Sequence, residues 1–209
     1  APDSFMIGID YAGTNDINLG TAGNDVFHKQ DGGLLDLQAG GNELSFGTSV
    51  SLDGQWLAVG APDSKGSTSN KTGNVFLFSY SDTSFSGGQL RAVIGDGRTT
   101  SEDFQTDLDF ELQADGSDGD AFGVGVSVFK GRLAIGAKEA DGSLQDTGDT
   151  NNKVQSSGEV HLFTFNDDVN AFTGVTHQAI IGQNWSGVDH QDKDTGASLR
   201  GYSNNAEGK

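Results

Sequence analysis

The sequence contains one segment twice. FGTSVSLDGQWLAVGA, from Phe46 to Ala61, returns without a gap 76 positions later as FGVGVSVFKGRLAIGA, from Phe122 to Ala137. Because a repeated unit of this kind buries its apolar face against its neighbour, we expect two similar units in contact. The second copy holds its extra residues mainly in the loop after Gly-Ala, since the later matches are offset by 85 and 87 residues. These matches are GNVFLFSY with GEVHLFTF, and AVIGDG with AIIGQN.

Each copy predicts four short strands. In the first copy, apolar residues alternate with serines, and Asp53-Gly54 predicts a two-residue hairpin turn. The third strand is apolar on both faces, which is typical of an internal strand that is covered twice. The predicted strands of this copy are Ser49–Leu52, Trp56–Val59, Val75–Tyr80 and Leu90–Ile94.

The composition also favours an all-β chain. Of the 209 residues, 12 are Lys or Arg and 30 are Asp or Glu, which gives a net charge of −18 and argues against nucleic acid or anionic membranes as partners. The acidity lies in turn-forming Asp, beside 32 Gly, and no long helical periodicity is present. No apolar run predicts membrane insertion, and the first residues do not resemble a secretory signal. The absence of cysteine excludes disulfides and thiolate metal sites.

The repeat resembles a known family. The string GDAFGVGVSVFKGRLAIGA, followed by a polar loop and GEVHLFTF, is similar to the FG-GAP repeat of integrin-α-type β-propellers, and VGAP at Val59–Pro62 matches it in the first copy. The resemblance covers Phe46–Gly97 and Asp115–Asn184 and implies one four-stranded blade per repeat. Two blades cannot close a ring, because closed propellers have about 4 to 8. We therefore expect an all-β fold of two blades packed with additional N-terminal strands, propeller-like or as a sandwich.

The N-terminal part resembles a second family. GTAGNDVF, at Gly20–Phe27, is similar to the calcium-binding nonapeptide of RTX proteins, although ordinary hairpin turns are an alternative. Together the two resemblances imply the peptide-binding domain of a Gram-negative RTX adhesin, which is part of a larger secreted protein at the bacterial cell surface. We expect one domain, 1–209, divided into an RTX-like segment (1–45), repeat 1 (46–97), a linking strand (98–121), repeat 2 (122–184) and a polar tail (185–209).

Three Asp-rich stretches predict calcium sites. Calcium takes six to eight oxygen ligands, and closely spaced Asp and Asn residues beside Gly supply them. Several ions would also offset the charge of −18 and stiffen the loops. The alternative is that each stretch is a solvated turn whose carboxylates cap backbone amides. The candidate ligands are Asp115, Asp118 and Asp120, then Asp141, Asp146, Asp149 and Asn151, then Asp189, Asp192 and Asp194.

Aromatic residues without a counterpart in the other repeat are candidates for ligand recognition. Trp185 and Tyr202, with Arg200, are the predicted binding residues, because exposed aromatic and Arg side chains often anchor interfaces. Covering a sheet edge is the alternative for them. For Trp56, packing and binding both remain open, and His161 is predicted to be a partly buried packing residue.

The sequence predicts a binding protein and not an enzyme. It lacks the GxSxG, HExxH, phosphate-loop and dinucleotide motifs, although a carboxylate pair for glycoside hydrolysis is not excluded. We expect a monomeric module within a longer chain, in which calcium-stiffened loops form a pocket for a peptide or protein ligand on another cell. A free C-terminal carboxylate bound to calcium is one form of that ligand. A calcium-dependent carbohydrate-binding module and a structural spacer remain the alternatives.

Overall fold

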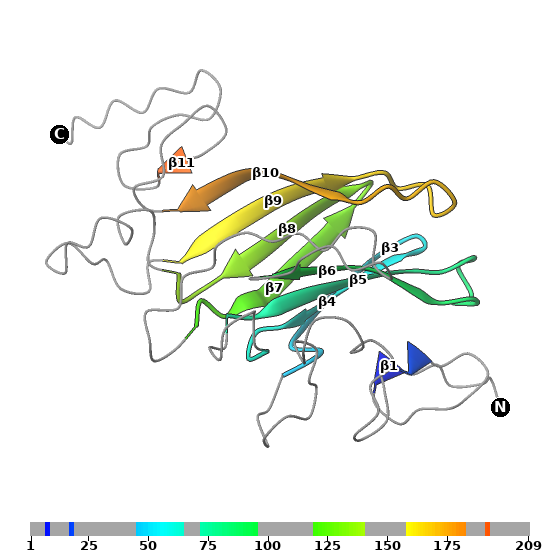
Figure 1. The fold of residues 1–209 in the computed structure, drawn as a ribbon, viewed down its shortest axis with the longest axis horizontal. Coiled ribbons are helices and arrows are strands. Elements are labelled where there is room, and N and C mark those ends of the chain that lie inside the picture. Colours follow the sequence, from blue (N-terminus) through cyan, green and yellow to red (C-terminus); the bar gives the residue numbers. More distant parts are fainter. Residues whose placement is uncertain are drawn as a thin grey trace, which may run out of the picture.

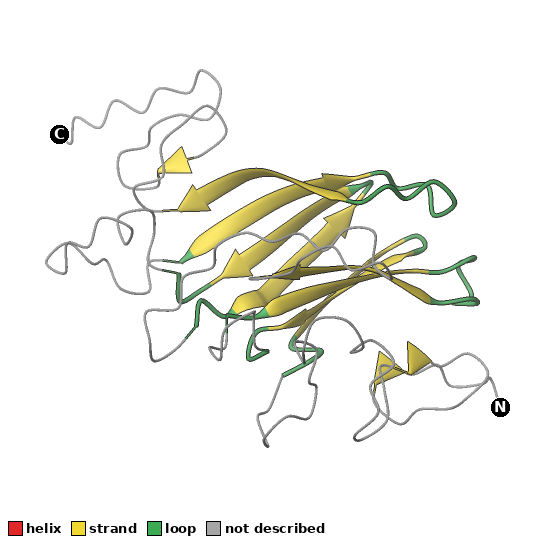
Figure 2. Ribbon diagram, in the orientation of Figure 1, coloured by secondary structure: helices red, strands yellow, loops and turns green. Residues whose placement is uncertain are grey.

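The computed structural model describes residues 7–8, 17–18, 45–64, 72–95, 119–140, 158–182 and 191–192. Every regular element in these ranges is a β-strand (Figure 2), which confirms the predicted fold class. The same ranges contain no helix long and apolar enough to cross a membrane. The strands are β1 (Ile7–Gly8), β2 (Ile17–Asn18), β3 (Ser49–Asp53), β4 (Trp56–Ala61), β5 (Asn74–Ser79), β6 (Gln89–Gly95), β7 (Phe122–Phe129), β8 (Arg132–Ala137), β9 (Glu159–Phe165), β10 (Val175–Gly182) and β11 (Gln191–Asp192).

Each repeat forms one sheet. Strands β3 to β6 make an antiparallel meander, the first sheet, and β7 to β10 make the same meander in the second sheet, where β11 adds in parallel beside β10. Figure 1 shows the two sheets as layers, with β7 lying next to the first sheet. A parallel bridge between Gly73 and Phe122 joins the start of β5 to the start of β7. In the N-terminal part, β1 and β2 pair with each other in parallel as a separate two-stranded sheet, so they do not form a hairpin.

The β3–β4 turn lies one residue later than predicted. Asp53 pairs with Trp56, so the two loop residues are Gly54, with a φ of +58°, and Gln55. Asp53 stays in the strand because its carboxylate accepts a hydrogen bond, at 2.6 Å, from the backbone N–H of Lys130 in the second sheet. A contact 77 residues away therefore sets the register of this turn.

The two sheets pack face to face, as expected. The first core lies between them and combines residues of both repeats, including Ala58 and Leu77 of the first sheet and Leu133 and Phe163 of the second. A second core lies on the opposite face of the first sheet, around Phe76 and its neighbours. All six residues of β5 are buried, which confirms that this strand is covered on both faces.

Polar side chains of β3 bind the backbone of β7. The Ser49 hydroxyl donates to the Gly123 carbonyl at 2.7 Å, and the Ser51 hydroxyl accepts from the Val128 N–H at 3.0 Å. The alternating apolar residues of β3 are consequently the exposed ones, with Val50 64% and Leu52 50% accessible. Hydrogen bonding to an adjacent sheet therefore places the serines of this strand inside.

His161 is more deeply buried than predicted. Its side chain is 2% exposed and its Nε2 lies 3.3 Å from the carboxylate of Glu159, which is also buried. Its ring contacts those of Phe122 and His177, with centroids 5.4 and 5.5 Å away. This ring occupies the position where the first repeat has Phe76, with the Glu159 carboxylate two residues away on the same face of β9.

Candidate ligand pocket between the two repeats

Equivalent hydrogen bonds close one loop in each repeat. The Gly73 N–H donates to the Ser64 carbonyl and the Gly158 N–H donates to the Ala140 carbonyl, both at 2.9 Å. Both donors are glycines with a positive φ, +93° and +74°, a conformation that favours glycine. The extra residues of the second copy thus enter at the point equivalent to 65–72, as the repeat offsets predict. These loop bases define one end of the two sheets, called here the loop end.

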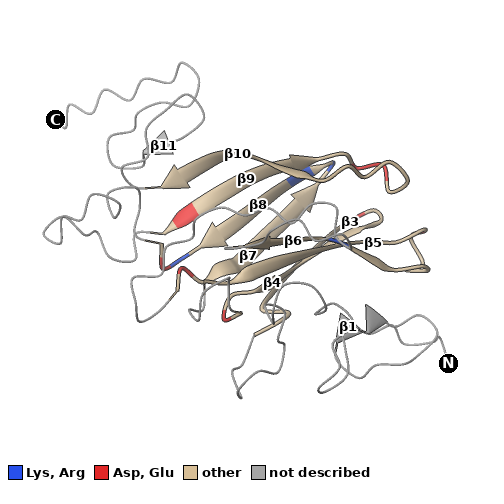
Figure 3. Ribbon diagram, in the orientation of Figure 1, with Lys and Arg blue, Asp and Glu red and all other residues tan. Residues whose placement is uncertain are grey.

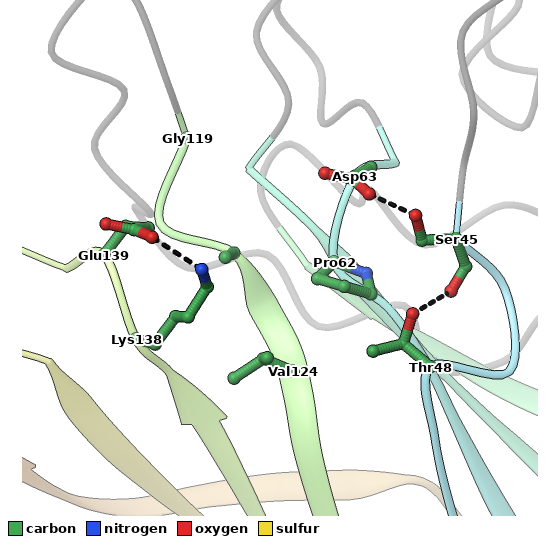
Figure 4. A pocket seen from close by; sticks show the side chains of 9 residues that line it. Ser45, Thr48, Pro62, Asp63, Gly119, Val124, Lys138 and Glu139 are labelled. Atoms are coloured by element: carbon green, nitrogen blue, oxygen red, sulfur yellow. Dashed lines mark hydrogen bonds and ion pairs between the residues drawn. The ribbon is translucent and has the colours of Figure 1, made fainter.

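A pocket of about 510 Å³ lies at the loop end between the repeats. Figure 4 shows that it lies between the turns at 45–48 and 121–124 and the segments that follow the two Gly-Ala pairs, 62–63 and 138–139. Eight of the nine described residues that line it form four pairs that are 76 positions apart, so each wall is the same structural element of one repeat. The pairs are Ser45 with Ala121, Thr48 with Val124, Pro62 with Lys138, and Asp63 with Glu139, and Gly119 completes the lining.

The two walls share one backbone conformation. Ser45 and Ala121 both have a φ of +53°, and the following turn is closed by Thr48 N–H to the Ser45 carbonyl at 3.1 Å and by Val124 N–H to the Ala121 carbonyl at 3.2 Å. A positive φ is uncommon for residues other than glycine and costs conformational energy. Its occurrence twice, at the rim of the pocket, shows that the surrounding structure imposes this turn in both repeats.

The side chains make the two walls chemically different. On the first wall, the Ser45 hydroxyl donates to the Asp63 carboxylate, and the Thr48 hydroxyl donates to the Ser45 carbonyl at 2.6 Å. On the second wall, the Lys138 ammonium lies 2.7 Å from the Glu139 carboxylate (Figure 4). The hydrogen bond and charge of Glu139, with a smaller effect of Asp63, raise the pKa of Lys138, so this side chain stays cationic.

The charged residues of the described ranges lie mostly at strand ends and in turns (Figure 3). In the pocket they amount to two carboxylates and one ammonium. Within the described ranges, no three His, Cys, Asp or Glu residues are grouped so that they could hold a metal ion. The described part of the pocket therefore offers two anionic oxygen donors and one cationic group, but no complete calcium site.

Only one predicted site residue has a described side chain. Asp120 lies between the pocket residues Gly119 and Ala121, is 7% exposed, and its carbonyl accepts a hydrogen bond of 3.1 Å from the Glu139 N–H. Asp192 lies in β11, and its side chain is not described. The remaining predicted residues lie outside the described ranges: Asp115, Asp118, Asp141, Asp146, Asp149, Asn151, Asp189, Asp194, Trp185, Arg200 and Tyr202. Gly20–Phe27 also lies outside them.

The sequence analysis missed four of the polar residues that line the pocket. Ser45, Asp63, Lys138 and Glu139 flank the repeated Phe-Gly and Gly-Ala pairs and belong to none of the Asp-rich stretches. The signal that could have found them is the alignment of the two repeats. Next to the matched Phe-Gly and Gly-Ala pairs, equivalent positions of the two copies carry different side chains.

The comparisons with known proteins identify part of the first repeat. The comparison with curated proteins gave no match to the chain. The family model of the FG-GAP repeat matches residues 40–78. This match includes β3, β4 and nearly all of β5, and with them the first wall of the pocket. The chain therefore contains an FG-GAP repeat at residues 40–78, which holds the first two strands and most of the third strand of its first sheet.

Proposed function

We propose that the chain is a calcium-dependent module of a bacterial cell-surface adhesin, which binds a peptide or protein ligand of another cell in the pocket between the repeats. The observation that carries the proposal is the pocket of about 510 Å³, whose two walls are equivalent in backbone and different in side chains. FG-GAP repeats are typical of extracellular, adhesion-type β-propeller-like domains, which supports the coarser part of the proposal. A concave site with a few convergent polar groups is where ligands usually bind.

The chemistry of the pocket favours a peptide over a sugar. None of the nine described residues that line it is aromatic, whereas aromatic faces with polar edges are well suited to the apolar faces of sugar rings. The pocket instead presents two carboxylates, an ammonium and two hydroxyl groups. These groups are suited to the amides and the charged ends of a peptide.

Calcium would offset the excess of carboxylates over ammonium groups in this pocket. Two predicted ligands, Asp118 and Asp120, are sequence neighbours of the pocket residue Gly119, and Asp141 follows Glu139 by two positions. With the carboxylates of Asp63 and Glu139, these residues match the preference of calcium for several oxygen ligands. A calcium ion with an open coordination position provides a binding site for the terminal carboxylate of a peptide.

Calorimetric titration of peptide pools, sorted by their last residue, tests the proposal in millimolar calcium and in excess EDTA. We expect binding only with calcium, and weaker binding of pools whose C-terminus is amidated. Lys138→Met and Glu139→Gln should weaken binding by about tenfold each. Lys130→Met, at the opposite hairpin turn, is the matched control and should bind as the unmodified chain does.

The alternatives give different results in the same design. Binding on a glycan array in calcium, without any peptide response, would assign the chain to carbohydrate recognition. Calcium binding without either ligand would favour the spacer. Peptide binding that is unchanged in EDTA would remove calcium from the proposal, and equal binding of the amidated pools would remove the terminal carboxylate.

A further inference from the structure

The face of the first sheet that packs on the second sheet carries two rows of small and aliphatic residues. In each row the three residues are cross-strand neighbours on β4, β5 and β6. All six are buried, and five of them are 0% exposed. They lie over the bulky face of the second sheet, which presents Leu133, Ile135 and Phe163. The two rows are Ala58–Leu77–Ala92 and Gly60–Val75–Ile94.

The second sheet carries the same two rows, residue for residue. They occupy the same positions on β8, β9 and β10, and they pair in the same register. Because successive residues of a strand point to opposite faces, these rows lie on the face turned away from Leu133, Ile135 and Phe163. The rows of this outer face are Ala134–Leu162–Ala179 and Gly136–Val160–Ile181.

The outer face is more accessible than its copy: Val160 is exposed and four of its row residues are half-buried, whereas Ala179 is buried. Val160 is 38% exposed, whereas its equivalent Val75 is 0% exposed. Phe129, on the same face, is 55% exposed and replaces Asp53 of the first repeat. A face that matches a buried interface residue for residue, and is itself partly exposed, is suited to the same kind of partner.

We propose that the outer face of the second sheet binds the bulky face of a third sheet of the same repeat type. The proposal continues the interface that already joins the two sheets, and it does not depend on the ligand pocket. A second copy of this chain is not the expected partner. The bulky face that a second copy would need, on its own first sheet, is already buried, since Phe76, Phe78 and Val59 are 0 to 3% exposed.

A glycine makes the close approach possible. A Cβ atom on Gly60 would lie 1.9 Å from the Gly123 carbonyl oxygen of the neighbouring sheet. Its equivalent on the outer face, Gly136, has no such neighbour, because the nearest atom to a Cβ there is 3.8 Å away. Gly136→Ala is therefore harmless to the chain alone, but it would block a third sheet that docks as the second does.

The test extends the full chain at its C-terminus with a second copy of residues 96–182. The chain has no cysteine, so Val160→Cys introduces a single thiol whose maleimide labelling reports on the outer face. We expect labelling to become about tenfold slower in the extended chain than in the chain alone. Adding Gly136→Ala to the extended chain should restore fast labelling. Val50→Cys, on the exposed side of β3, is the control and should react equally in both chains.

Two results would overturn the proposal. Equal labelling of Val160→Cys in both chains would overturn the proposal. The proposal requires the outer face to bind the added repeat, so this result would count against it whether or not that repeat folds. Protection in the unextended chain that grows with protein concentration, together with a dimer mass by light scattering, would assign the face to a second copy.

Discussion

The indole N–H of Trp56 donates a hydrogen bond of 2.8 Å to the backbone carbonyl of Asp167, 111 residues away. Trp56 starts β4 in the first sheet, and Asp167 lies in the loop between β9 and β10 of the second. The Trp56 ring packs on Phe165 and Phe172, with centroids 4.8 and 5.4 Å away, and is 4% exposed. Trp56 therefore connects the two repeats. Of the two roles that the sequence left open for it, packing and ligand binding, the structure supports packing.

Replacing Trp56 should destabilise the chain strongly. We expect Trp56→Ala to lower the free energy of unfolding by about 3–5 kcal/mol, because it removes a buried aromatic ring and leaves the Asp167 carbonyl without its donor. Urea unfolding followed by circular dichroism measures this loss. Arg132 occupies the equivalent position in the second repeat and is exposed. Arg132→Ala is the matched control and should change stability by less than about 0.5 kcal/mol. Equal losses in the two variants would contradict the assigned role.

Much of the fold was predictable because it is encoded locally. The apolar run Val75–Phe78 in β5 and the matched offsets of the two copies are enough to place the strands and their order. Contacts distant in sequence determine what remained unpredicted: the carboxylate of Asp53 meets the Lys130 N–H, and the hydroxyls of Ser49 and Ser51 meet the β7 backbone. No local pattern records which side of β3 faces a second sheet.

The pocket was less predictable than the fold. Its walls are formed only when two turns 76 residues apart face each other, so residue clusters along the chain give no sign of it. The acidic composition predicts calcium ligands in the Asp-rich stretches, of which only Asp120 has a described side chain. The difference between Pro62 and Lys138 beside the repeated Gly-Ala pair was present in the sequence. It indicates a functional site only once both residues are known to line one cavity.

The inter-sheet contact should tolerate no side chain at Gly60. A Cβ there would lie 1.9 Å from a backbone oxygen and 2.4 Å from the Ser49 hydroxyl, and the backbone oxygen cannot move without shifting β7. We expect Gly60→Ala to lower the free energy of unfolding by about 3 kcal/mol, at the upper end of overpacking effects. Neither Gly60 nor its equivalent Gly136 has a positive φ, so the contrast between them is steric.

Gly136→Ala in the unextended chain is the internal control for this prediction. Its added Cβ would approach no atom closer than 3.8 Å. Thermal unfolding of both variants should show a lowered melting temperature only for Gly60→Ala. A similar drop for the two would mean that the loss comes from glycine replacement in a strand and not from the contact between sheets.

Tyr80 should resist ionisation in the folded chain. Its side chain is 1% exposed, and burial raises the pKa of its phenol well above the usual value of 10.0. The folded state therefore keeps a proton that the unfolded state releases, so stability is complete below about pH 10 and falls by up to about 1.4 kcal/mol per pH unit above it. Absorbance at alkaline pH should show one of the three tyrosines ionising only as the chain unfolds. Tyr80→Phe should remove that late step, and a late step that persists in this variant would assign it to another tyrosine.

Calcium should stabilise the folded chain, because ions bound only by the folded state shift the unfolding equilibrium. With calcium at about 100 times its dissociation constant, one site contributes about 2.7 kcal/mol, and a chain of this size should melt about 5–10 °C higher. Scanning fluorimetry in millimolar calcium and in EDTA measures the difference.

The carboxylates of Asp120 and Glu139 lie on adjoining segments, which are joined by the hydrogen bond from the Glu139 N–H to the Asp120 carbonyl. Asp120→Asn and Glu139→Gln should therefore reduce the calcium response, whereas Asp168→Asn, in the β9–β10 loop at the opposite end of the sheets, should not. Identical melting in calcium and EDTA would show that the Asp-rich stretches are turns, and would leave the repulsion at a net charge of −18 uncompensated by calcium.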